Sequence, residues 1–226
     1  NAGRQSIVTG DLLVQANGTE VAPGRAAINV DGGGLVALGN ISVLATGISR
    51  DASGVGQGGS ATVNVLNGGQ MGTALDLRVS ADGLGGFNDS NDGGRGRGGT
   101  AAINVSGTGS VLIGDNITAS ADGLGGALAL DPVTGNAIVA DEGGDGFGGN
   151  ATINISGGAQ LTATVGVTAS AAGQGRVGLV ESGNGTGGDA RILVTGAGTG
   201  FTSPQTTVIA AGIGGGSISD RFFGTD

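Results

Sequence analysis

Carboxylates recur at one position of a repeated phrase, and their chemistry is that of a site for a hard cation. The seven-residue phrase Ser-Ala-Asp-Gly-Leu-Gly-Gly occurs at 80–86 and again at 120–126, so Asp82 and Asp122 occupy equivalent positions. Two carboxylates placed one repeat apart repel each other unless a cation or a hydrogen-bond donor lies between them. Calcium is the natural cation, because it takes carboxylate and carbonyl oxygens from flexible loops.

More acidic residues lie in the glycine-rich segments beside these two phrases. We expect them to contribute to the same calcium site, and the alternative is that they only cap loops and keep the surface soluble. Apart from calcium, the residue content indicates no cofactor. The candidate metal ligands are Asp82, Asp89, Asp92, Asp122, Asp141 and Asp145.

A five-residue phrase of alternating apolar and polar residues defines the repeat that carries these carboxylates. Ala-Thr-Ile-Asn-Ile at 151–155 is one copy, and others begin at Ala26, Ala61, Ala101 and, in a degraded form, Ala190. Such self-similarity is typical of repeat architectures. Measured from this alanine to a closing glycine, the blocks run over 26–47, 61–83, 101–123, 151–173 and 190–212, and residues 6–18 match the second half of a block.

Inside a block the apolar period is two, which predicts strands, and no segment has the 3.6-residue period of a helix. Three short strands with glycine corners would form one triangular rung. The sequence therefore predicts an all-β parallel β-solenoid, or β-helix, of about five to six rungs as a single domain over 1–226. The glycine- and aspartate-rich segments 48–60, 84–100, 124–150 and 174–189 are expected to leave the stack as loop insertions at one corner, and 213–226 to form a tail or cap.

The rungs should stack equivalent residues into rows. We expect Ile28, Val63, Ile103, Ile153 and Ile192 in one inward row, and Leu35, Met71, Val111, Leu161 and Phe201 as the inward residues of the short middle strands. The outward residues Asn29, Asn64, Asn104 and Asn154 either form a hydrogen-bonded amide ladder or are simply solvated. Residues 127–140 contain two alternating arms around a Pro/Gly turn, which predicts a protruding β-hairpin.

Composition argues against several classes of function. The net charge is −9, with nine arginines and no lysine, whereas nucleic-acid binding needs a concentrated basic face. No apolar run approaches the roughly 20 residues of a membrane span, so we expect no membrane insertion. The chain has no His, Lys, Cys, Trp or Tyr, which leaves a polysaccharide-active β-helix enzyme as a remote alternative to a non-enzymatic protein.

The repeat phrases at 101–110 and 151–161 resemble the passenger repeats of bacterial autotransporter and filamentous-haemagglutinin-type surface proteins. This resemblance covers nearly the whole chain. It implies a β-solenoid displayed outside the cell, at the bacterial surface or in the extracellular space. Such repeats serve adhesins, fibres and inert stalks alike.

The ends of the repeat array favour a structural role. The first rung is incomplete and the chain opens at Asn1, which indicates a mature or excised piece of a longer protein. Terminal rungs expose unpaired backbone, so we expect a self-associating subunit of an extracellular fibre, filament or layer. The alternative is an adhesin passenger domain that binds a cell-surface or matrix ligand. The residues expected to mediate assembly are Leu12, Val14, Phe222 and Phe223.

Overall fold

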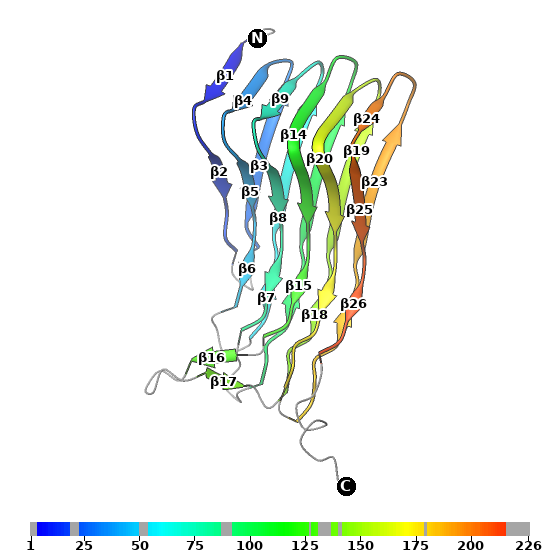
Figure 1. Cartoon of the computed structure of the whole chain (residues 1–226). Helices are drawn as coiled ribbons and strands as arrows, with labels where there is room; N and C mark the ends of the chain where they lie inside the picture. The colour runs from blue at the N-terminus through cyan, green and yellow to red at the C-terminus, as the bar shows by residue number, and fades with distance from the viewer. Residues whose placement is uncertain are drawn as a thin grey trace.

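The computed structural model describes residues 4–18, 23–49, 54–86, 92–126, 128–130, 137–139, 142–178 and 180–215, and none of them is helical. Its strands stack in parallel, so successive repeats lie side by side along one axis (Figure 1). The prediction of an all-β parallel solenoid is confirmed. Of the calcium and assembly candidates, Asp89, Asp141, Phe222 and Phe223 lie outside the described residues.

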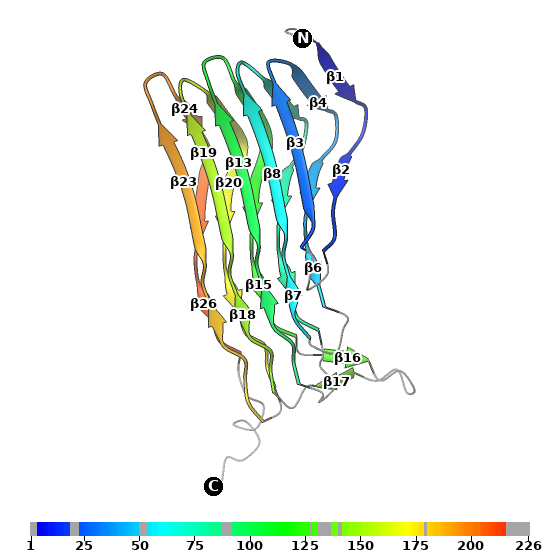
Figure 2. The same cartoon turned by 180° about the vertical axis from the view of Figure 1, so that it is seen from behind.

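The back sheet contains the phrase that defines the repeat, and it faces the viewer in Figure 2. Its parallel register places Ile103 beside Val63 and Ile153, and Ile28 and Ile192 continue the same row. Ile103 and Ile153 are fully buried, so the predicted inward row is confirmed. The strands are β3 (Arg25–Asp31), β8 (Ser60–Leu66), β13 (Thr100–Ser106), β19 (Asn150–Ser156) and β23 (Asp189–Thr195).

The front sheet forms the opposite face and contains both the middle and the closing strands of each repeat. These are separate strands in most repeats and form the single long strands β14 and β20 in two of them, with a register shift between Gly114 and Asn116. The strands are β1 (Gln5–Val8), β2 (Leu12–Gln15), β4 (Gly34–Ala37), β5 (Ile41–Leu44), β9 (Gln70–Thr73), β10 (Leu77–Ser80), β14 (Val111–Ser120), β20 (Gln160–Ser170), β24 (Gly200–Thr202) and β25 (Gln205–Ile209).

The expected triangular rung is therefore wrong, because the second and third strands of each repeat belong to one sheet and the coil is flattened into two layers (Figures 1 and 2). One predicted inward residue is also wrong. Leu112, and not Val111, pairs with Met71 and Leu161 in the middle row and is fully buried. The turn before it is one residue longer than in the next repeat, which moves the register by one and turns Val111 to the other face.

Two narrow sheets form the glycine-rich end of each coil. The first glycine sheet comprises β6 (Gly47–Ile48), β11 (Gly83–Leu84), β15 (Gly123–Leu124), β21 (Gly173–Gln174) and β26 (Gly212–Ile213), and the second comprises β7 (Gly56–Gln57), β12 (Gly96–Arg97), β18 (Gly146–Phe147) and β22 (Gly185–Thr186). The second sheet lies within segments that we expected to be loop insertions. That expectation is wrong for these residues, which stack in parallel register from repeat to repeat.

The two glycine sheets approach each other through their backbones. A Cβ atom added at Gly96 would lie 2.0 Å from the carbonyl oxygen of Leu124, and one added at Gly123 would lie 2.0 Å from that of Phe147. Hydrogen bonds also cross between the layers nearby, for example from the N–H of Gly99 to the carbonyl of Ala81 at 2.7 Å. Only residues without side chains fit this contact, which explains part of the glycine content of the chain.

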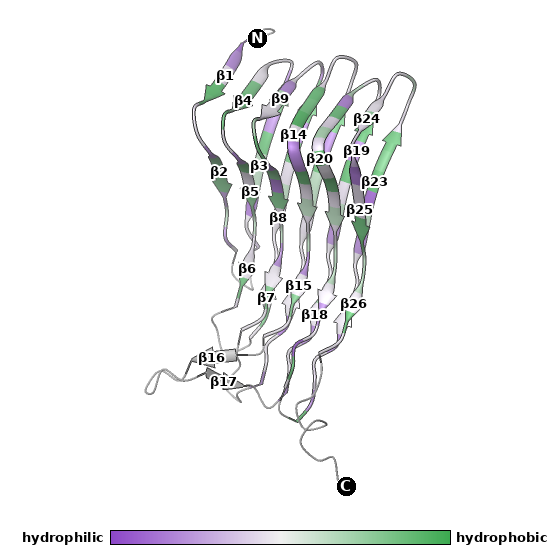
Figure 3. Ribbon diagram, in the orientation of Figure 1, coloured by the Kyte–Doolittle hydropathy of each residue, from purple (hydrophilic) through white to green (hydrophobic). Residues whose placement is uncertain are grey.

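The core lies between the front and back sheets and consists of aliphatic rows. Figure 3 shows apolar and hydrophilic residues alternating along these strands, as the period of two requires. The predicted hairpin is present as antiparallel β16 (Leu128–Leu130) and β17 (Ala137–Val139), which leaves the stack near the glycine-rich end (Figure 1). Most of the stability therefore depends on contacts between neighbouring repeats.

Candidate functional site

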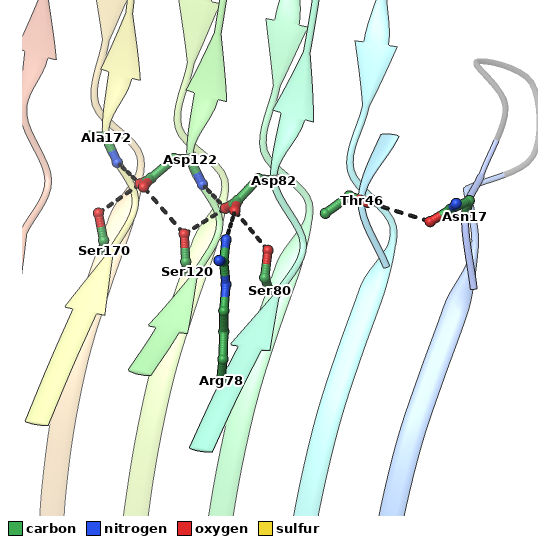
Figure 4. Close-up of polar contacts among 9 residues, drawn as sticks. All are labelled: Asn17, Thr46, Arg78, Ser80, Asp82, Ser120, Asp122, Ser170 and Ala172. Atoms are coloured by element: carbon green, nitrogen blue, oxygen red, sulfur yellow. Dashed lines mark hydrogen bonds and ion pairs between the residues drawn. The ribbon is translucent and has the colours of Figure 1, made fainter. Parts of the chain in front are cut away.

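The strands β10 and β14 place the two best calcium candidates at the same corner. Asp82 and Asp122 each follow the end of a front-sheet strand by two residues, at the point where the chain turns into the first glycine sheet. Ser80 and Ser120 precede them by two residues, and because strand side chains alternate, serine and aspartate point to the same side. Figure 4 shows the resulting row of oxygen atoms across successive repeats.

The Asp82 carboxylate accepts hydrogen bonds from two repeats. Ser80 Oγ donates at 2.6 Å within its own repeat, while Ser120 Oγ at 2.5 Å and the Asp122 N–H at 2.8 Å donate from the next one. Arg78 Nη2 also lies 3.3 Å from Asp82 Oδ2, although its side chain is largely exposed. The carboxylate therefore joins neighbouring coils through hydroxyl and amide donors.

Asp122 accepts the equivalent hydrogen bonds from the repeat that follows its own. Its Oδ1 accepts from Ser170 Oγ at 2.6 Å and from the Ala172 N–H at 2.7 Å. The three serines are almost fully buried, so their hydroxyls need acceptors. We name Ser80, Asp82, Ser120, Asp122 and Ser170 the Ser/Asp ladder.

The Ser/Asp ladder ends in both directions where the sequence changes. Ala172 occupies the position of the aspartates in the following repeat and has no side-chain acceptor. In the preceding repeats the same position holds Asn17 and Thr46, which are joined by a hydrogen bond from Thr46 Oγ1 to Asn17 Oδ1 at 3.4 Å. The sequence predicted the proximity of Asp82 and Asp122 but missed the serines, whose signal was the spacing Ser-Ala-Asp in both phrases.

The structure places Asp92 and Asp145 elsewhere, beside the second glycine sheet. They line a surface depression of about 360 Å³ together with Glu142 and Glu181. Arg95 Nε lies 3.6 Å from Asp145 Oδ2, and the N–H of Asn184 donates to Asp145 Oδ1 at 2.8 Å. Glu181 was not among the sequence candidates, and its position beside Glu142 follows only from the parallel bridge between the two residues.

The four calcium candidates that the structure describes are thus not one cluster. Asp82 and Asp122 form hydrogen bonds within the ladder, and Asp92 and Asp145 line the depression. Within the described ranges, no group of three or more acidic side chains has a geometry that could hold a metal ion. The hydrogen bonds of Asp82 and Asp122 fit the alternative of capping, while calcium binding stays a prediction.

The outward asparagines form the amide ladder that was one of two alternatives. Nδ2 of Asn64 donates to Oδ1 of Asn29 at 2.6 Å, and the same contact joins Asn104 to Asn64 and Asn154 to Asn104 at 2.9 Å. Leu193 follows in the last repeat and ends the ladder. Like the Ser/Asp ladder, this row stabilises the stacking of neighbouring repeats.

Two of the assembly candidates lie at the first coil. Leu12 pairs with Ile41 and Val14 with Val43, so both continue inward rows and are only half buried. They are the last members of these rows on the N-terminal side, as the pattern predicted.

No known protein family, curated protein or solved structure matches the chain. Among the residues that the structure describes, no helix has the length and apolar character required to cross a membrane.

Proposed function

We propose that this chain is a non-enzymatic structural protein, a subunit of an extracellular fibre, filament or surface layer that forms by association of copies. The observation that carries the proposal is that the same in-register rows run through the described stack, and that the first and last described strands of these rows have no described neighbour on their outer side. Open edges of this kind favour addition of further strands.

The polar groups of the stack support a structural role. The Ser/Asp ladder and the asparagine ladder both direct their hydrogen bonds to neighbouring repeats and not to a shared point where a substrate could bind. The chain also has no His, Lys or Cys to act as a base or nucleophile. A polysaccharide-active enzyme remains the remote alternative.

Localisation outside the cell rests on the resemblance to bacterial passenger repeats. The charge of −9 favours solubility and opposes nucleic-acid binding, and the absence of cysteine fits a secreted chain as well as a cytosolic one. The cell surface or the extracellular space is the setting in which passenger-like solenoids act.

An adhesin passenger domain is the second candidate, and the hairpin β16–β17 favours it. This hairpin leaves the stack near the glycine-rich end, where a cell-surface or matrix ligand could reach it (Figure 1). Deleting residues 127–140 separates the two functions. Loss of binding to cells or matrix with unchanged self-association would identify an adhesin.

Sedimentation velocity over a wide range of protein concentrations tests the structural proposal. We expect the sedimentation coefficient to rise with concentration as copies associate. A single monomeric species at every concentration would contradict the proposal.

A further inference from the structure

The two ends of the solenoid differ in how well their inward rows are covered. Strand β3 has no described neighbour on its N-terminal side in the back sheet, yet Ala26, Ile28 and Val30 are only 2%, 8% and 7% exposed. Strand β2 of the N-terminal half-coil (β1 and β2) contacts β3, and its residues Leu12 and Val14 pack against the same core. The N-terminal half-coil therefore acts as a cover for an open inward surface.

The C-terminal end has no such cover among the described residues. Val208 is 51% exposed, although its neighbour in the same row, Ala169, is fully buried. Val194 is 44% exposed beside the fully buried Ile155. The last coil thus presents inward aliphatic residues in the arrangement that the half-coil covers at the other end.

The strand edges differ in charge. The outer strands of the back sheet carry Arg25 and Asp31 in β3, and Asp189 and Arg191 in β23. The edge strands of the front sheet, β1, β2, β24 and β25, contain no charged residue. Charged side chains on an edge oppose pairing with another chain, so the front-sheet edges are the ones left able to pair.

We propose that β1 and β2 of one copy add in parallel to β24 and β25 of a second copy, which names the interface of the proposed self-assembly and rests on it. Continuing the observed register places Leu12 of one copy beside Thr206 of the other, and Val14 beside Val208. The pairing is the one that already joins β20 to β25 within the chain. Val208 and the uncharged backbone edge are then removed from water, which drives association.

The offset between the sheets keeps the charged edges apart. In each copy the front sheet starts one strand before the back sheet, because β1 and β2 precede β3. When the front sheets join, one strand position stays unfilled between β23 of one copy and β3 of the next. The charged residues of these two strands are therefore not forced into direct contact.

A pair of matched variants tests the surface. We call the contact between β25 of one copy and β2 of the next the junction. Val208→Arg places a charge in the junction, at a residue that is 51% exposed. Val165→Arg places the same charge on the outer face of the front sheet, at a residue that is 50% exposed. We expect concentration-dependent sedimentation to be lost in the first variant and kept in the second, with both circular dichroism spectra unchanged. Equal behaviour of the two folded variants would overturn the proposed junction.

Disulfide trapping tests the register, since the chain contains no cysteine. Leu13 and Thr207 share one outward row, so the junction brings their Cα atoms to about 5 Å, within the range of a disulfide. Oxidised L13C/T207C protein should form covalent multimers that disappear on reduction. In the control L13C/Q205C the second cysteine lies two residues from position 207 along the same strand, a displacement of about 7 Å. This variant should form far fewer covalent multimers.

The outcomes distinguish this junction from the proposed function itself. Self-association without the register-specific disulfide would overturn the junction and leave assembly intact. Absence of both self-association and disulfide would contradict both. If multimers appear only after residues 216–226 are deleted, that segment covers the end in place of a second copy, and the proposal is wrong for the full chain.

Discussion

The N–H of Asp122 donates to Oδ1 of Asp82 at 2.8 Å, so two acidic residues that should repel each other are joined through the backbone of one and the carboxylate of the other. The contact links two successive coils. Ser120 Oγ adds a second donor to the same oxygen at 2.5 Å. The role that follows for Asp82 is to hold neighbouring coils in register.

Replacing Asp82 by alanine should destabilise the protein by about 1–3 kcal/mol, because the Ser120 hydroxyl and the Asp122 N–H lose their acceptor at a half-buried site. Urea unfolding measures the change. Asp189→Ala is the matched control, since its ion pair with Arg191 is about 60% exposed on both sides and should contribute less than about 1 kcal/mol. Equal effects of the two variants would contradict the role of the ladder.

Calcium should leave the melting temperature unchanged if Asp82 and Asp122 act only as hydrogen-bond acceptors. A ligand that binds only the folded state raises that temperature, so melting curves in millimolar calcium and in chelator decide the question. A calcium-dependent rise of the melting temperature that Asp82→Asn abolishes would show that calcium binds at Asp82 and Asp122. A rise that only Asp145→Asn removes would place it in the acidic depression.

Ile153→Asp should destabilise the protein by about 3 kcal/mol or more, because it puts an unpaired charge into a fully buried row. Ile113→Asp is the control at an outward position that is 46% exposed. Deletion of residues 127–140 should cost less than about 1 kcal/mol, since the hairpin lies outside the stack. If this deletion lowers the unfolding midpoint more than Ile153→Asp does, the division into coils and inserts is wrong.

Gly96→Ala should destabilise the protein by about 1–3 kcal/mol or more, because the added methyl group overlaps the carbonyl oxygen of Leu124 across the two glycine sheets. Gly72→Ala is the same substitution in strand β9, where nothing lies within 4 Å of the new Cβ. It should change stability by less than about 1 kcal/mol. Thermal unfolding of both variants compares them directly, and a tolerated Gly96→Ala would show that the two sheets can separate.

The alternation of apolar and polar residues predicted much of the stack. It placed Ile103 and Ile153 inside, and it put Asn104 and Asn154 in one outward row, because the period of two fixes the face of every residue once the strands are in register. The hairpin was also predicted, since its two arms show the same period around a turn.

The glycine sheets were not predicted, because the inserts differ in length and glycine has no apolar side chain to mark a face. Their signal was present as Gly-X-Gly-Gly, which is separated by one residue from the start of the repeat phrase, at 56–59, 96–99, 146–149 and 185–188. The serines of the Ser/Asp ladder were missed for a related reason. Ser120 and Ser170 donate to aspartates of the preceding coil, and a contact between coils follows only from the observed register.

Diffraction from oriented assemblies of the full chain tests the central claim most directly. If copies join end to end through the front sheet, the strands of every copy stack along the direction of growth. The account then predicts a reflection at about 4.8 Å along the long axis of the assembly. A 4.8 Å reflection across that axis, or protein that stays monomeric at every concentration, would contradict it.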